Sequence, residues 1–182
     1  MATSDKDLIE FIRKGDRVAM KQLYDRFIGS LSFICSRYIS DNEEVKDILH
    51  DCFIKIFSSI DKFRWKGEGS LKAWMTRIVI NESLKHLKTK EKSPLMRYDD
   101  IQQDIPEEDA NPERIPLDVL LGFIRELPPG YRAVFNLVVF DGYSHKQAAA
   151  ELGISESTSA SQLHRAKAIL AKRINEYGRL EQ

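Results

Sequence analysis

Apolar residues recur at helical intervals through most of the chain, and this period limits the possible folds more than any other feature. Between Val45 and Ile60, apolar side chains follow one another at alternating steps of three residues and one residue. That spacing places them on one wide face of an α-helix. A second stripe of this kind runs from Met20 to Tyr38, and Asp5 to Arg13 has the length of a short first helix. The sequence therefore predicts an all-α protein that begins with a helical bundle.

A proline-rich acidic segment divides the chain. Residues 93–118 contain eight acidic residues, two basic residues and four of the six prolines. The regions on either side, residues 1–92 and 119–182, carry formal charges of +4 and +2, so the whole chain is neutral. Proline lacks the backbone N–H that helices need, and a dense acidic run repels itself. We therefore expect two small helical domains, 1–92 and 119–182, joined by a flexible acidic linker, 93–118.

Composition argues against several classes of protein. No apolar stretch approaches the roughly 18 residues of a membrane span, and the first residues alternate charged with apolar types, unlike a signal peptide. The two cysteines, Cys35 and Cys52, lie within apolar helical patterns, which favours a reducing, cytoplasmic setting. The sequence has no glycine-rich phosphate loop, no nucleophile–base set and no metal-ligand spacing. We expect neither an enzyme nor a bound cofactor or metal.

The helical pattern breaks at residues 61–70, where aromatic and basic residues alternate. Phe63 and Trp65 are interleaved with Lys62, Arg64 and Lys66, and residues 62–92 hold nine basic but only three acidic residues. Cations beside flat rings suit single-stranded nucleic acid, which offers a charged backbone and unstacked bases. The alternative is a solvated loop whose aromatic rings enter the core. Two glycines end the preceding helix, and Ser70 is expected to cap the next one.

The next predicted helix presents two different faces. At about 100° per residue, one face gathers Leu71, Met75, Ile78 and Val79, which we expect in the core. A neighbouring stripe about 80° wide contains no acidic residue. It consists of Trp74, Arg77, Asn81, Lys85 and Lys88. A structural surface helix more often mixes both signs of charge, so the stripe favours nucleic-acid contact, although Trp74 could instead lie at the border of the core. Lys72 adds a further cation to this helix.

The C-terminal half predicts a helix-turn-helix. Leu117 to Leu127 is helical, Pro128 to Gly130 forms a stop, and Tyr131 to Phe140 is apolar enough for a buried helix. Ser144 and Gln147 then have the spacing of a capping box, and Gly153 lies where a turn needs a positive φ. Ser155 can cap a last helix that runs to about Asn175. Two helices joined by a glycine turn form a helix-turn-helix.

The last helix combines a buried seam with a polar face. Leu163, Ala166 and Leu170 are expected to form the seam. The other side offers hydroxyl, amide and guanidinium groups, which read base edges in the major groove. The candidate contacts with DNA are Ser144, Ser157, Thr158, Ser161, Gln162, His164, Arg165 and Lys167. A helical hairpin that binds another protein is the alternative.

Together these motifs resemble the bacterial RNA polymerase sigma factors, specifically the extracytoplasmic-function (ECF) group. The resemblance covers nearly the whole chain. In the first half it is carried by the phrases Asp61–Arg64 and Leu71–Trp74 and by Asn81. In the second half it is carried by the phrase Leu127–Phe135 and by the helix-turn-helix motif from Gly153 to Lys167.

The resemblance implies a function and partners for both halves. The first domain would be sigma region two, which binds core RNA polymerase and captures and melts the minus-ten promoter element. The second would be region four, whose helix-turn-helix reads the minus-thirty-five element. Promoter DNA, the clamp helices of the largest polymerase subunit, the flap region and an anti-sigma factor are the expected partners. The polymerase-binding residues would be Asp47, His50, Asp51 and Ile54 on the helix from Glu43 to Ile60. The minus-ten contacts would be Phe63, Arg64, Trp65, Lys72, Trp74, Arg77, Asn81, Lys85 and Lys88.

Two other interpretations stay open on the sequence alone. A repressor that acts without polymerase would be expected to dimerise and bind a palindrome. Alternatively, the N-terminal half could be a bundle that binds only proteins. The chain also departs from its relatives at Ser159 to Gln162, where many of them carry two cations, so Arg165 and Lys167 are left with more of the attraction to phosphate.

Overall fold

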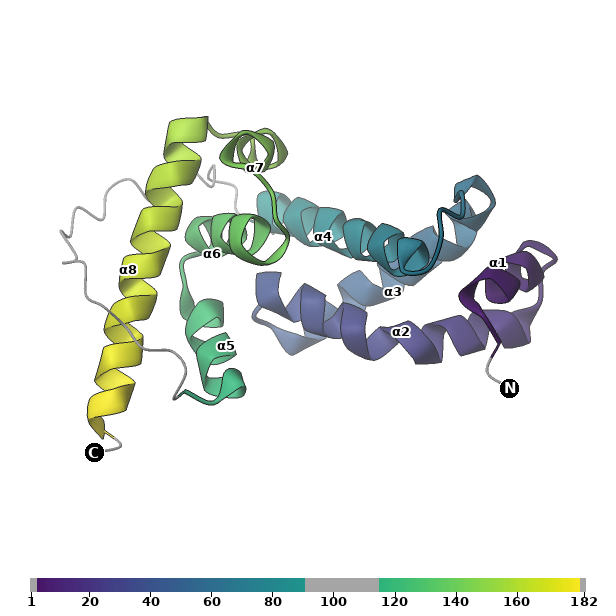
Figure 1. The fold of residues 1–182 in the computed structure, drawn as a ribbon, viewed down its shortest axis with the longest axis horizontal. Coiled ribbons are helices and arrows are strands. Elements are labelled where there is room, and N and C mark those ends of the chain that lie inside the picture. The colour runs from purple at the N-terminus through teal and green to yellow at the C-terminus, as the bar shows by residue number, and fades with distance from the viewer. Residues whose placement is uncertain (1–2, 91–114, 181–182) are drawn as a thin grey trace. The chain divides into compact units, whose positions relative to one another are not determined.

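The computed structural model describes residues 3–90 and 115–180, and every regular element within them is helical (Figure 1). The all-α prediction is confirmed. The chain divides into two compact units, Met1–His86 and Leu87–Gln182. Residues 93–114 of the predicted linker lie outside the described residues. The last two residues of that linker, Leu117 and Asp118, lie in a helix, in line with the helical pattern that the sequence shows from Leu117.

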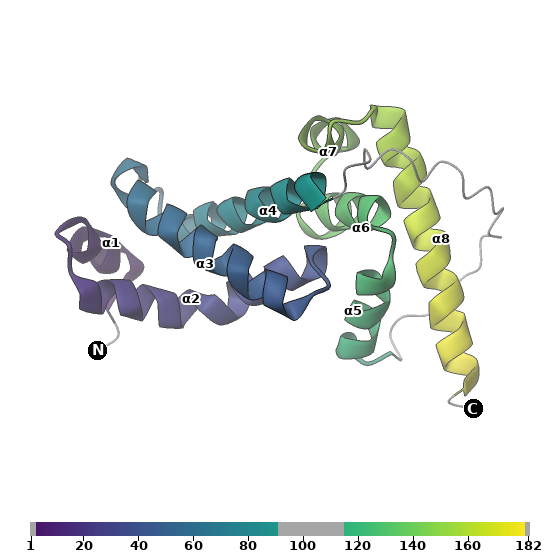
Figure 2. The same cartoon turned by 180° about the vertical axis from the view of Figure 1, so that it is seen from behind.

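The first unit is a bundle of four helices and a short 3-10 turn. These elements are α1 (Asp5–Arg13), α2 (Arg17–Tyr38), α3 (Asn42–Ser59), η1 (Ile60–Lys62) and α4 (Ser70–Lys90). Side-chain oxygens of Ser4, Asp16 and Asp41 accept hydrogen bonds from the first amides of α1, α2 and α3. In Figures 1 and 2, α2, α3 and α4 run beside one another, whereas α1 lies across one end of α2.

The predicted apolar stripes form the core of this unit. Leu23, Leu31, Ile56 and Met75 have no exposed surface. Cys35 and Cys52 are buried with them, and loss of solvation raises the pKa of both thiols, that of Cys52 to about 12. Both thiols are therefore protonated at neutral pH and unreactive in the folded protein. No group of three metal-ligating side chains, and no helix long and apolar enough to cross a membrane, occurs among the described residues.

The second unit contains the helix-turn-helix. Its elements are α5 (Leu117–Glu126), α6 (Pro129–Phe135), a π-helical turn η4 (Asn136–Phe140), α7 (His145–Leu152) and α8 (Glu156–Leu180). The prolines separate α5 from α6, because a residue that precedes proline is forced out of the helical region. Accordingly, Leu127 and Pro128 are extended, with ψ of 145° and 141°. In Figure 2, α8 runs along α5, α6 and α7.

Two sequence predictions for this unit are corrected. The segment from Tyr131 to Phe140 is not one buried helix: it widens into η4, and Val139 and Phe140 are 46% and 47% exposed. A π-helical turn holds more residues than an α-helical one, so side chains within it no longer follow the α-helical period that predicted their burial. The last helix continues to Leu180 instead of ending near Asn175.

The local signals around the glycine turn are confirmed. The Ser144 hydroxyl and the Gln147 side chain form a reciprocal capping box at the start of α7. Gly153 ends α7 in the left-handed conformation, with φ of 72° and ψ of 34°. The Ser155 hydroxyl then accepts a hydrogen bond from the Thr158 amide at 3.0 Å. These contacts within a few residues determine where α7 ends and α8 begins.

Replacing Gly153 by alanine should loosen the helix-turn-helix. A Cβ at this position meets no atom within 4 Å, so the cost is conformational: about 1–2 kcal/mol for an L-residue in the left-handed region. Hydrogen exchange followed by mass spectrometry should show about 5- to 30-fold less protection of the α7 and α8 amides. Gly122→Ala is the matched control, because Gly122 lies within α5, also has open space around its Cβ and has ordinary helical φ. Equal protection in the two variants would contradict the argument.

Candidate nucleic-acid interface

The loop between η1 and α4 is closed by its own backbone and by Ser70. Gly67 and Gly69 have φ of 107° and 79°, a region that L side chains rarely adopt. The Ser70 hydroxyl donates to the Gly67 carbonyl at 2.6 Å and accepts from the Lys66 amide at 3.2 Å. Ser70 was predicted as the residue before the helix, but α4 begins at Ser70 itself. Its hydroxyl therefore holds the loop together instead of capping the next turn.

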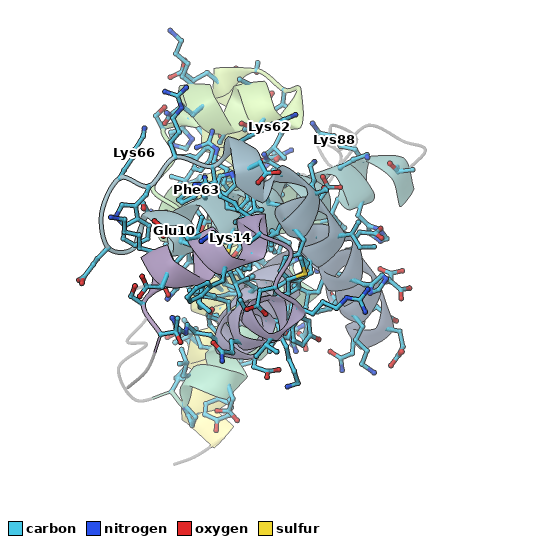
Figure 3. All side chains as sticks on the ribbon, turned by 90° about the vertical axis from the view of Figure 1, so that its right-hand side faces the viewer. Glu10, Lys14, Lys62, Phe63, Lys66 and Lys88 are labelled. Carbon is cyan, nitrogen blue, oxygen red and sulfur yellow. The ribbon has the colours of Figure 1, made fainter. Side chains whose placement is uncertain are left out.

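The two aromatic residues of the loop have different surroundings. Phe63 is 7% exposed, and its ring centroid lies 5.0 Å from that of Trp74 on α4. The Phe63 ring therefore lies in the core against Trp74, as the alternative interpretation of the loop expects, while its role as a minus-ten contact stays a prediction. Trp65 is half-buried, and Arg64 and Lys66 beside it are exposed. Lys66 extends outward from the loop in Figure 3. One ring of the loop thus joins the core, and the other stays partly exposed beside the cations.

Helix α4 separates its two faces as the helical period predicts. Leu71, Met75 and Val79 are fully buried, whereas Ile78 is half-buried. The predicted contacts Lys72, Arg77, Asn81, Lys85 and Lys88 are all exposed. Trp74 is half-buried, so it lies where the stripe meets the core. This stripe of α4 thus offers part of one aromatic ring, one amide and several cations to solvent.

Charge pairing near this surface leaves it cationic. Glu82, the acidic residue of α4, is 2.6 Å from the Lys55 ammonium of α3 and 4.0 Å from that of Lys85. Its side chain is only 18% exposed. A single partly covered carboxylate shared by two lysines cannot neutralise the exposed stripe. The geometry suits a polyanion whose bases can reach the half-exposed rings.

A separate face of α3 carries the residues predicted to bind polymerase. Asp47, His50 and Asp51 are exposed, and Ile54 is 56% exposed although it is apolar. They occupy positions i, i+3, i+4 and i+7, which lie on one side of a helix. The opposite side of α3 is buried through Ile48, Cys52 and Ile56. This arrangement presents acidic groups around an exposed apolar side chain, which suits a basic protein surface.

The polar face of the helix-turn-helix is exposed, with one exception. Ser144, Ser157, Ser161, His164 and Lys167 are exposed, and Thr158 and Arg165 are half-buried. Gln162 is 1% exposed, so its predicted place on this face is corrected: it lies on the side of α8 that also buries Leu163 and Ala166. The expected seam of Leu163, Ala166 and Leu170 is confirmed as buried.

Polar contacts between helices position α8. The Nδ1 atom of His145 at the start of α7 lies 3.0 Å from the buried Ser159 hydroxyl of α8. The Arg165 guanidinium donates to the Tyr131 hydroxyl of α6 at 3.4 Å. These contacts could not be predicted from the sequence, because each depends on how distant segments pack.

Comparison with known proteins places both halves of the chain in one family. Residues 23–93 match the family described as Sigma-70 region 2, and residues 117–170 match Sigma-70, region 4. The ECF RNA polymerase sigma-E factor of Escherichia coli K12 is 27% identical over 94% of both chains. The chain belongs to the ECF group of RNA polymerase sigma factors. This sigma factor therefore acts in promoter-specific initiation of transcription with RNA polymerase, as a DNA-binding protein.

Further relatives agree with this assignment. The ECF sigma-E factor of Haemophilus influenzae is 26% identical, over 94% of this chain and 95% of its own. Two solved structures share the fold with a TM-score of 0.51 each. One is CnrH in complex with the cytosolic domain of CnrY, 23% identical and covering 94% of this chain and 97% of its own. The other is the sigma factor RpoE of Bartonella quintana in complex with the anti-sigma factor NepR, 21% identical and covering 84% and 94%.

Proposed function

We propose that this sigma factor captures the melted minus-ten element of a promoter with the loop after η1 and the exposed stripe of α4. The observation that carries the proposal is the acid-free stripe of α4 together with a closed loop in which the half-buried Trp65 lies between two exposed cations. Duplex DNA hides its ring faces, so a surface that offers side-chain rings fits unpaired bases. Flipping a base out costs a few kcal/mol of stacking, which ring contacts and hydrogen bonds offset. The exposed Asn81 amide has both a donor and an acceptor, the groups that reading a base edge requires.

The helix-turn-helix supports a second contact, with the minus-thirty-five element as a duplex. The exposed hydroxyl and imidazole groups of α8 can reach base edges in the major groove, and Lys167 can neutralise a phosphate. Two cations common in relatives are replaced by Ser159 to Gln162, and two of these four residues are buried. We therefore infer that region four alone binds duplex DNA weakly, and that tethering to polymerase raises its effective affinity for the promoter.

The remaining exposed surfaces suggest where protein partners bind. We infer that the α3 face of Asp47, His50, Asp51 and Ile54 docks on the clamp helices of the largest polymerase subunit, and that region four meets the flap region. An anti-sigma factor is a further expected partner, because both similar structures were solved as complexes, one of them with an anti-sigma factor by name.

Reconstitution with core RNA polymerase tests the proposal. The full chain is mixed with core enzyme and a library of promoter-length duplexes, and the start sites and enriched sequences are read. We expect start sites that need both components, two enriched elements one spacer apart, and permanganate-reactive thymines in the downstream element. Initiation without a reactive, melted element would contradict capture by the loop and α4.

Paired variants assign the two elements within the same experiment. Asn81→Ala, on the exposed stripe, should relax base selection in the minus-ten element alone. Ser161→Ala, on the exposed face of α8, should relax it in the minus-thirty-five element alone. Both residues are exposed in the free protein, so neither change disturbs the core. If either variant altered selection in the other element, the assignment would be wrong.

A further inference from the structure

One arginine links the first helix of the chain to the loop that we propose binds the minus-ten element. The Arg13 Nη2 atom donates to the Phe63 carbonyl at 2.6 Å and to the Ile60 carbonyl at 3.3 Å. These contacts span 50 and 47 residues of sequence. In Figure 3, Phe63 lies beside α1 near Lys14, the residue that follows Arg13.

The two carbonyls belong to the point where α3 gives way to the loop. Ile60 ends α3 and begins η1, and its carbonyl also accepts the Phe63 amide at 3.2 Å. Carbonyls at the C-terminus of a helix have no partner within the helix and carry partial negative charge. A guanidinium is the side chain best suited to bind them, since it keeps its charge and presents several donors.

Arg13 is itself held in place. Leu8, Ile9 and Ile12 anchor α1 in the core with at most 3% exposure. At the other end of α1, the Arg26 guanidinium of α2 donates to Asp5 at 2.6 Å and to the Thr3 carbonyl at 2.7 Å. Because these contacts hold α1 in place, the backbone of Arg13 has a fixed position from which its side chain contacts the loop.

We propose that Arg13 is a positioning residue for minus-ten recognition. It fixes the Phe63 carbonyl on one side while Trp74 contacts the Phe63 ring on the other, and Ser70 closes the far end of the loop. The segment from Arg64 to Lys66 therefore follows a residue, Phe63, whose backbone and side chain are both held by contacts. Without Arg13 this segment samples more orientations, and the energy difference between a correct and a wrong base falls. The inference rests on the proposed capture of the minus-ten element.

Base discrimination by holoenzyme tests this role. The probe is a single-stranded oligonucleotide that carries the minus-ten sequence selected by the reconstituted wild type, compared with one changed at its most selective base. We expect Arg13→Ala to reduce the ratio of the two affinities about 5- to 10-fold, while core binding is unchanged. Arg13→Lys, which keeps the charge with a shorter and narrower donor, should restore part of the ratio. Lys14→Ala, which removes a neighbouring exposed cation, should keep the wild-type ratio.

Each outcome has a distinct meaning. A loss of stability alone would weaken both oligonucleotides equally and leave their ratio intact, so a wild-type ratio in Arg13→Ala overturns the inference. An equal loss in Lys14→Ala would assign the effect to charge and overturn it as well. If wild-type holoenzyme failed to distinguish the two oligonucleotides, minus-ten capture itself would be wrong. That failure is recognised in the wild type, before any variant is compared.

Discussion

Reversing the charge of Asp47 and Asp51 should lower the affinity for core RNA polymerase by about 100-fold. Both carboxylates are exposed on α3, one turn apart, and the exposed Ile54 lies on the same side. If this face docks on a basic surface, two lysines would bring like charges together, which costs several kcal/mol. Each factor of ten corresponds to 1.36 kcal/mol. Titration of labelled Asp47→Lys/Asp51→Lys protein with core enzyme measures the loss.

Asp25→Lys is the control for a general effect of charge. Asp25 is an exposed acid of α2 in the same unit, and its ion pair with Lys21 is solvated on both sides. Exposed pairs of this kind contribute little to stability, so the variant should fold and bind core like the wild type. A loss of affinity in Asp25→Lys comparable to that of the double variant would contradict a specific role of the α3 face.

Removing the Trp65 ring should block promoter opening while core binding persists. Stacking of one base on an aromatic side chain contributes about 1–3 kcal/mol, so Trp65→Ala should bind the minus-ten single strand about 5- to 150-fold more weakly. The loop is held by Phe63, Ser70 and its glycines, so the truncation leaves its backbone in place. Permanganate reactivity of promoter thymines and oligonucleotide affinity report the two effects.

Trp65→Phe separates stacking from loop structure. A phenyl ring keeps a flat face for the base but loses the indole N–H, so this variant should retain most of the opening activity. Trp65 and Trp74 are the two tryptophans of the chain, so in Trp65→Phe the remaining fluorescence reports on Trp74 alone. Normal opening by Trp65→Ala would show that the base is not stacked on this ring.

Comparison with known proteins decides between a repressor and a sigma factor, a choice that the residues alone left open. A repressor that acts without polymerase needs only a helix-turn-helix. The helix-turn-helix of the C-terminal half is compatible with a repressor as well as with a sigma factor. The match of residues 23–93 to Sigma-70 region 2 assigns the N-terminal half to the family that initiates transcription with RNA polymerase.

Short-range chemistry made much of the fold predictable from the sequence. Helical period identified α1 to α4, the capping box of Ser144 and Gln147 marked the start of α7, and Gly153 marked its end. Each signal involves residues within a turn or two of one another, whose geometry the backbone imposes whatever lies around them. The exposed cations of α4 were predictable for the same reason.

Local patterns do not reveal which polar and aromatic side chains face solvent at their boundaries. Phe63 is buried because Trp74 covers it, and Gln162 because neighbouring helices pack over its side of α8. The hydrogen bonds of Arg13 to the loop join residues about 50 positions apart, which no local pattern reveals. Local sequence was enough to predict the helices, the glycine turn, the acidic face of α3 and the basic stripe of α4. Packing between distant segments determines how the loop is held, because the burial of a side chain depends on what lies opposite it.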